Sequence, residues 1–170
     1  MSEENSSFNT VTLKLPSIIM EKLKDVGVDV ESLIIDLIVD NLNLKPEEEL
    51  EVHRELARRF LEEGMKLIDV NPVQASEKLY KAAEEAVKTL VLKHRLRSIV
   101  ERVEKRGRWK VEDLFDAISE LRQIYSDDIR RWWDSAWNLH VWGFHEAKAT
   151  KRYVEERIRD VEELVKLAIE

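Results

Sequence analysis

Residues Asn71–Leu90, NPVQASEKLYKAAEEAVKTL, form the stretch that decides the fold. Asn71 suits the cap position before a helix, Pro72 suits its first position, and Gln74 stands three residues after the cap. One face of the helix then carries mostly small side chains at helical spacing, namely Ala75, Leu79, Ala82, Ala83, Ala86 and Leu90. Such a face lets a neighbouring helix approach closely, so the stretch predicts one helix of a packed helical bundle.

Further helical patterns lie on both sides of this stretch. With the central helix, which we expect to reach Leu96 or beyond, the predicted helices cover residues 46–69, 72–96, 111–125, 126–145 and 150–168. The connections between them are short, which favours antiparallel neighbours. We therefore predict an all-α fold, with an antiparallel up-and-down bundle of four to five long helices over residues 46–170.

The N-terminal part of the chain has a different pattern. Val11, Leu13 and Leu15 alternate with polar residues over positions 9–15, which predicts a short half-buried strand. Two short helices follow, at about 16–26 and, after Gly27 and a cap at Asp29, at about 29–43. The predicted organisation is a disordered tail at 1–8, a strand–helix–helix module at 9–45 and the bundle at 46–170.

Composition excludes several classes of protein. The 170 residues contain no Cys, so disulfides, thiolate metal sites and a cysteine nucleophile are excluded. We find no apolar run of membrane-spanning length, no secretory signal and no Gly-rich phosphate loop, and we expect a cytoplasmic protein without a membrane partner. Lys, Glu and Arg dominate the polar residues, a bias typical of thermophile proteins.

The net charge of −7 is unevenly distributed. Residues 88–110 hold nine basic and two acidic residues, a local charge of +7, so the rest of the chain carries −14. We expect this segment to be a solvated helix end and loop, and keep a binding patch for nucleic acid or for an acidic partner surface as the alternative. The candidate contacts for that alternative are Arg95, Arg97, Arg102, Arg106 and Arg108.

An aromatic run at residues 130–145 holds four of the five tryptophans. On an α-helix Trp133, Trp137, His140 and Phe144 share one face, and with Tyr80 they form either a ligand pocket or a part of the core. His145 falls beside this face, on a predicted polar edge. Glu and His pairs occur without an H-E-x-x-H arrangement, so we predict no metal site and no cofactor.

The stretch from Pro72 to Lys88, preceded by Leu61-Glu62-Glu63-Gly64, resembles a signature of the archaeal PaREP family. Asn138-Leu139-His140 followed by an aromatic residue near 144 resembles that family's C-terminal signature. The resemblance covers roughly residues 20–168. The PaREP family is similar in turn to the HEPN superfamily, which implies a helical bundle, a homo-oligomer of two or more chains, and a protein partner such as a nucleotidyltransferase.

HEPN ribonucleases carry an Arg separated by four to six residues from a His on one helix. The matching positions before His140 hold Trp133, Asp134 and Ser135, and the nearest arginines, Arg130 and Arg131, are too far along the chain. Without a guanidinium the main stabilisation of a developing anion is missing, so we expect no enzyme activity. A degenerate ribonuclease using His140 with Arg130 or Arg131 remains an alternative hypothesis.

Residues 9–43 separately resemble a ribbon-helix-helix module, in which two chains pair one strand each. That resemblance implies that Thr10, Thr12 and Lys14 would face the DNA bases. Residues 1–45 hold eight acidic residues against four lysines, however, and Asp29 and Glu31 stand where such modules contact phosphate. We therefore favour a dimerising module without DNA contact over a DNA-binding regulator.

The leading hypothesis is a non-catalytic, oligomeric helical protein whose bundle binds a protein partner or a small ligand. DNA regulation through the N-terminal module is the second hypothesis, and degenerate HEPN-type RNA cleavage is the third.

Overall fold

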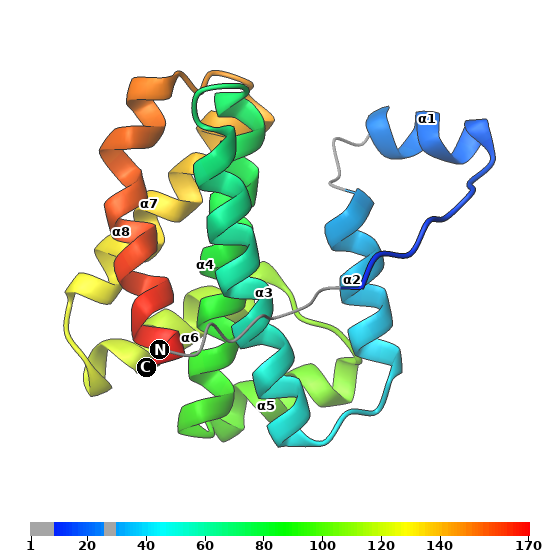
Figure 1. The fold of residues 1–170 in the computed structure, drawn as a ribbon. Helices are drawn as coiled ribbons and strands as arrows, with labels where there is room; N and C mark the ends of the chain where they lie inside the picture. The colour runs from blue at the N-terminus through cyan, green and yellow to red at the C-terminus, as the bar shows by residue number, and fades with distance from the viewer. Residues whose placement is uncertain (1–8, 26–29) are drawn as a thin grey trace, which may run out of the picture.

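The structure, a computed structural model, describes residues 9–25 and 30–170, and every regular element in these ranges is a helix (Figure 1). The elements are α1 (Ser17–Asp25), α2 (Val30–Asn41), α3 (Pro46–Leu67), α4 (Pro72–His94), α5 (Arg97–Arg106), α6 (Val111–Ile124), α7 (Asp128–Asn138), the π-helix η1 (Leu139–His145) and α8 (Lys151–Ile169). The predicted all-α class is confirmed for the bundle region. Within the described ranges, no helix has both the length and the apolar composition that crossing a bilayer requires.

Helix α4 begins as its sequence predicts. The side chain of Asn71 accepts a hydrogen bond from the backbone N–H of Gln74 at 3.2 Å, and Pro72 occupies the first turn. The helix ends earlier than predicted, because Arg95 adopts a left-handed conformation with φ of 51° and its N–H bonds back to the carbonyls of Leu92 and Val91. The basic segment after it therefore forms a separate helix, α5, which ends at Gly107 with φ of 76°.

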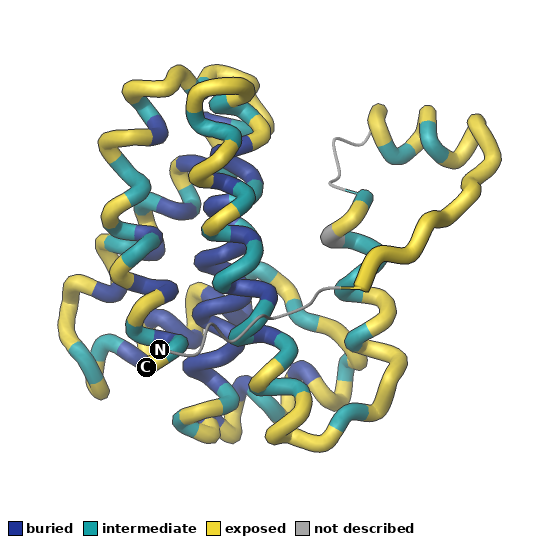
Figure 2. The backbone as a smooth tube through the Cα atoms, viewed as in Figure 1, coloured by how far each residue is buried: buried dark blue, intermediate teal, exposed yellow. Residues whose placement is uncertain are grey.

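Helix α4 is buried from Ser76 to Val91 on nearly all sides (Figure 2). Helix α3 packs along it, and the approach is close at Gly64, where an added Cβ would lie 2.8 Å from the side chain of Leu79. Helices α8, α7 and η1 contact α4 as well. The small side chains of α4 allow these close approaches, as the sequence pattern predicts.

The last aromatic segment is not one continuous α-helix. Regular α-helical structure ends at Asn138, and Leu139–His145 forms a π-helix, in which backbone hydrogen bonds span five residues. At Gly143 this segment lies directly against α4, since an added Cβ would lie 2.6 Å from Ser76 Oγ. The prediction of an unbroken α-helix to His145 is therefore wrong in its last seven residues. Residue periodicity does not reveal such a local change of helix type.

No strand forms at residues 9–15. The segment is extended, and its apolar residues Val11 and Leu13 are 80% and 55% exposed. A strand needs a partner for its backbone hydrogen bonds, and the described part of this chain offers none. Helix α1 has no buried residue and lies away from the bundle (Figure 1). The predicted tail at 1–8 and the predicted break and cap at Gly27 and Asp29 fall outside the described residues.

Candidate functional site

Aromatic side chains from α4, α7 and η1 meet in one cluster. Trp133 is fully buried and belongs to the core, whereas Trp137 and Phe144 are partly exposed. The rings of Tyr80 and His140 stack with centroids 4.0 Å apart, and Trp137 lies 5.4 Å from His140. The five predicted pocket residues are thus brought together, with His140 between the buried and the solvent-exposed members.

The imidazole of His140 is held by a buried carboxylate. Its Nδ1 lies 2.7 Å from Oε2 of Glu77, whose side chain is 5% exposed, whereas that of His140 is 18% exposed. Because a carboxylate oxygen accepts, Nδ1 of His140 carries the proton and donates it. The Nε2 of a neutral His140 is then left with a free lone pair. Sequence reasoning missed Glu77, which is 63 residues from His140 along the chain.

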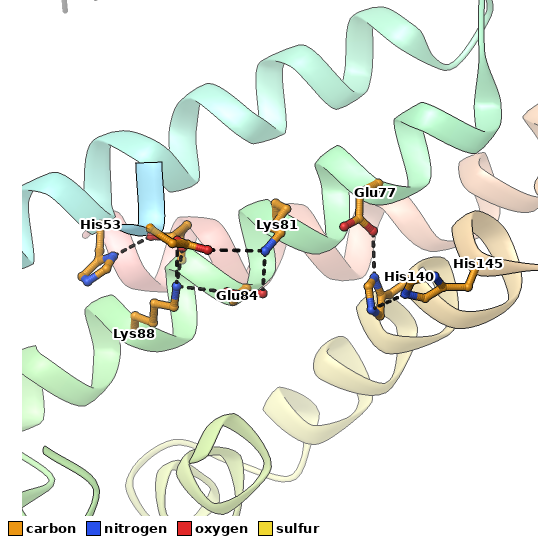
Figure 3. A network of polar contacts seen from close by, with 9 residues as sticks. His53, Glu77, Lys81, Glu84, Lys88, His140 and His145 are labelled. Atoms are coloured by element: carbon orange, nitrogen blue, oxygen red, sulfur yellow. Dashed lines mark hydrogen bonds and ion pairs between the residues drawn. The ribbon is translucent and has the colours of Figure 1, made fainter. Parts of the chain in front are cut away.

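His145 joins the same site through the π-helix. Its Nε2 lies 3.0 Å from Nε2 of His140, and the ring centroids are 4.3 Å apart. On an α-helix, residues five apart point in different directions, whereas the i to i+5 bonding of a π-helix brings them to one face. His145 is exposed and lies beside the aromatic face, and the direct contact with His140 was not predicted. Figure 3 shows this pair beside Glu77.

A second polar centre lies further along α4, where Lys88 and Glu85 are almost fully buried (Figure 3). The Nζ of Lys88 lies 2.7 Å from Glu85 and 2.9 Å from Glu84, and 3.6 Å from Asp36 of α2. The other oxygen of Glu85 lies 2.5 Å from Nδ1 of His53 on α3. The sequence does not predict this centre, because single Lys, Glu and His residues within a helix usually face solvent.

The charges of this second centre stabilise one another. Burial favours the neutral forms, but Glu84 and Glu85 hold the pKa of Lys88 well above its usual range. Burial likewise opposes ionisation of Glu85, yet Lys88 and His53 lower the pKa of its carboxyl. Burial also opposes protonation of His53, but Glu85 and a hydrogen bond to Glu49 raise its pKa. The centre is thus a compact group of alternating charges.

Carboxylate oxygens of Asp36, Glu84 and Glu85 lie within 4.8 Å of one another, a spacing that a metal ion can bridge. The ammonium of Lys88 already contacts all three carboxylates. It supplies the positive charge that a metal cation would bring, so we interpret the three carboxylates and Lys88 as a structural ion-pair centre.

Arg130 and Arg131 lie on the outer face of α7. Arg130 pairs with Asp134 at 3.7 Å, and Arg131 contacts Asp128 at 3.3 Å and Asp160 of α8 at 3.7 Å. Both guanidinium groups are mostly exposed and engaged with carboxylates, whereas His140 is bonded to Glu77 on the side facing α4.

The predicted basic candidates lie on α5 and in the turns on either side of it. Arg102 and Arg106 bind the buried carboxylate of Asp113 at 2.9 and 2.7 Å, which partly neutralises them. Arg95 and Arg97 border a cavity of about 530 Å³ between the start of α3, the end of α4 and α5. Arg108 is exposed. Arg102 and Arg106 are thus engaged with acidic side chains of α6, which reduces their availability for phosphate.

Thr10, Thr12 and Lys14 are exposed on the extended N-terminal segment. In a strand formed by this segment they would lie on the face opposite Val11, Leu13 and Leu15.

Comparisons with known proteins agree with the helical fold. A sequence model of the archaeal PaREP1/PaREP8 family matches residues 52–165. A crystal structure of a protein from Sulfolobus solfataricus is 43% identical, covering 67% of this chain and 93% of that chain, with a TM-score of 0.63. A solution structure of the same structural-genomics target is 43% identical, covering 67% of this chain and 88% of that chain, with a TM-score of 0.60. No curated protein matches the sequence. The family match contains His53, Glu77, His140 and His145 and excludes residues 9–43.

Proposed function

This chain belongs to the archaeal PaREP1/PaREP8 family, and from that premise we propose that it is a non-catalytic, oligomeric interaction protein. Residues 9–43 join two chains as a ribbon-helix-helix-like module. Residues 46–170 form a HEPN-like up-and-down bundle that meets a protein partner or ligand.

The observation that carries this proposal is the exposed apolar surface of the N-terminal segment. The exposed aliphatic side chains are those of Val11, Leu13, Leu15, Ile18, Ile19, Leu37, Ile38 and Leu42. Single exposed apolar residues are common, but eight within 32 positions of one short module favour burial against another surface.

A second copy of the same segment fits that surface. The backbone groups of residues 9–15 are exposed to water and not paired in a sheet, and an identical segment placed antiparallel about a two-fold axis would pair with them. The alternation then puts Val11, Leu13 and Leu15 of both strands on one face, where the apolar faces of the short helices can cover them. Apolar burial of this kind is the main source of stability in obligate dimers.

DNA reading by Thr10, Thr12 and Lys14 is less well supported. Glu31, at the start of α2, forms ion pairs with Arg59 and Lys78. Burial opposes its ionisation, but Lys78 and Arg59 lower the pKa of Glu31, so it is charged at neutral pH. The carboxylate of Glu31 occupies the helix start at which a phosphate would bind, and the cations Arg59 and Lys78 are already paired with it, so this helix start offers little attraction for phosphate.

Light scattering coupled to gel filtration of the full-length protein tests the proposal. We expect an oligomer for the wild type, a shift to monomer for Leu13→Lys, and no shift for the matched control Thr12→Lys on the opposite face. Circular dichroism establishes that both variants keep their helices. A monomeric wild type at every concentration, or equal behaviour of the two variants, contradicts the proposal.

A further inference from the structure

We propose that His140 and His145 bind one divalent transition-metal ion between their Nε2 atoms, with Glu77 orienting His140. The proposal is independent of oligomerisation through residues 9–43. Imidazole nitrogen suits Zn²⁺, Ni²⁺ and Cu²⁺, and the affinity of such sites is highest for Cu²⁺.

The separation of the two nitrogens matches a shared ion. Imidazole nitrogens bind these ions at about 2.0–2.1 Å, so two of them at right angles lie about 2.8–3.0 Å apart, and about 3.3–3.4 Å apart at a tetrahedral angle. The two Nε2 atoms are 3.0 Å apart. The geometry therefore suits adjacent positions of a square-planar or tetragonal ion, as Cu²⁺ and Ni²⁺ prefer, better than tetrahedral Zn²⁺.

The carboxylate behind His140 is the support that metal-binding histidines usually have. Such a histidine donates its other ring N–H to a carboxylate or carbonyl, which fixes the tautomer and the ring orientation. Glu77 accepts from Nδ1 of His140 at 2.7 Å and is almost fully buried. Tyr80 stacks on the same imidazole and limits its rotation further.

The backbone holds the pair in place. The π-helix brings His140 and His145 to one face, and π-helical segments occur frequently at functional sites. Gly143, between the two histidines, lies directly against Ser76 of α4, the residue before Glu77. His145 is exposed, so an ion can enter from solvent and keep water or a further ligand in its remaining positions.

The other two histidines of the chain lack this arrangement. His53 is buried with Nδ1 on Glu85, and Nε2 of His94 lies 2.6 Å from the hydroxyl of Tyr125. His94 is thus a suitable control, because its removal deletes one imidazole without touching the pair.

A simple hydrogen bond is the competing explanation of the 3.0 Å contact, with Nε2–H of His145 donating to Nε2 of His140. That arrangement needs no metal and predicts no saturable uptake. Titration with metal ions therefore separates the two explanations.

The experiment titrates CuCl₂ and NiCl₂ into the tag-free full-length protein by calorimetry, with tryptophan fluorescence as a second signal, since Trp137 adjoins His140. We expect about one ion per chain at saturation and an electron paramagnetic resonance spectrum of Cu²⁺ with two imidazole nitrogens. His145→Ala should abolish saturable binding, Glu77→Gln should weaken it about 10-fold to 100-fold, and His94→Ala should leave it unchanged.

Absence of saturable binding to the wild type, or equal binding to His145→Ala, overturns the proposal. Because His145 is exposed, its replacement does not threaten the fold, and circular dichroism verifies this. Glu77→Gln is isosteric and serves as a second, independent variant.

Discussion

At the scale of single residues, Lys88 shows how a charge is kept inside this bundle. Its side chain is 3% exposed, and carboxylates surround its ammonium. Removing an ion from water costs several kcal/mol, which close contacts offset only when the geometry is good. The ion-pair centre of Lys88 therefore stabilises the fold only while all its charges are present. Removal of one partner leaves the other charges buried and unpaired.

Replacement Lys88→Met should destabilise the protein by about 3–5 kcal/mol, because buried carboxylates lose their cation. The loss should be smaller at pH 5 than at pH 8, since the carboxyl groups can then take up protons. Urea unfolding at both pH values measures it. Lys93→Met, at an exposed position of the same helix, should change stability by less than about 0.5 kcal/mol; similar losses for both variants would refute this account of Lys88.

His53 gives a pH dependence of defined sign. Burial opposes its protonation, but Glu85 and Glu49 raise the pKa of the imidazole above the usual 6.5. The stability gained from the protonated imidazole is therefore complete below pH 6.5 and is lost as the pH rises through the higher folded-state pKa. Thermal unfolding should be measured for the wild type and His53→Gln from below pH 6.5 upward. The difference in stability between the two proteins should shrink as the pH rises.

His94 provides the opposite case. Burial, with the nearby Lys93, lowers the pKa of its imidazole. Its contribution is present above the usual pKa and is lost as the pH falls, so His94→Gln should show the reverse trend in the same experiment. If the stability lost on substitution changed with pH in the same direction for His53→Gln and His94→Gln, the opposite pKa shifts given to the two histidines would be contradicted.

At the scale of elements, the sequence predicts helix starts better than helix irregularities. The cap predicted at Asn71 is confirmed, and the helix predicted to begin at 150 starts with Thr150 as its cap, because a capping side chain bonds to backbone only three residues away. The left-handed turn at Arg95 and the π-helix at 139–145 were not predicted. No residue type marks them, and packing against α4 accompanies the second. Contacts such as Glu77 with His140 depend on that packing and cannot be found from spacing alone.

The contact of Gly143 with Ser76 can be tested at the same scale. Gly143→Ala should destabilise the protein by about 1–3 kcal/mol, because the new methyl group would lie 2.6 Å from Ser76 Oγ. In a Ser76→Gly background, which removes the clashing atoms, the same change should be neutral or stabilising, since Ala favours helix over Gly. Urea unfolding of the wild type, the two single variants and the double variant gives the coupling free energy between Gly143 and Ser76. Additive effects would mean that this contact does not set the approach of η1.

At the scale of the whole molecule, the bundle and the exposed N-terminal segment differ in whether one chain contains the partners that each part needs. The helices of the bundle find their partners within residues 46–170, so the all-α class follows from one sequence. The alternation at 9–15 is typical of a strand, but a strand requires a second backbone, and the described chain does not supply one. The proposed pairing of two chains would supply that second backbone.

Hydrogen exchange should report this difference. We expect the amides of α4 to exchange most slowly, because its residues are buried on nearly all sides. Amides of residues 10–15 and α1 should exchange quickly in dilute protein and become protected as the concentration rises, since dimerisation follows mass action. Protection of residues 10–15 that is independent of concentration would oppose pairing between chains.

Helix α4 carries a polar contact group at two places along its length, with Glu77 facing His140 and, about 12 Å further on, Glu85 facing His53. A turn of this helix about its own axis by even one residue would break both groups together. The two contacts together therefore define which face of α4 each neighbouring element meets, and a displacement of η1 alone would break only the contact of Glu77 with His140.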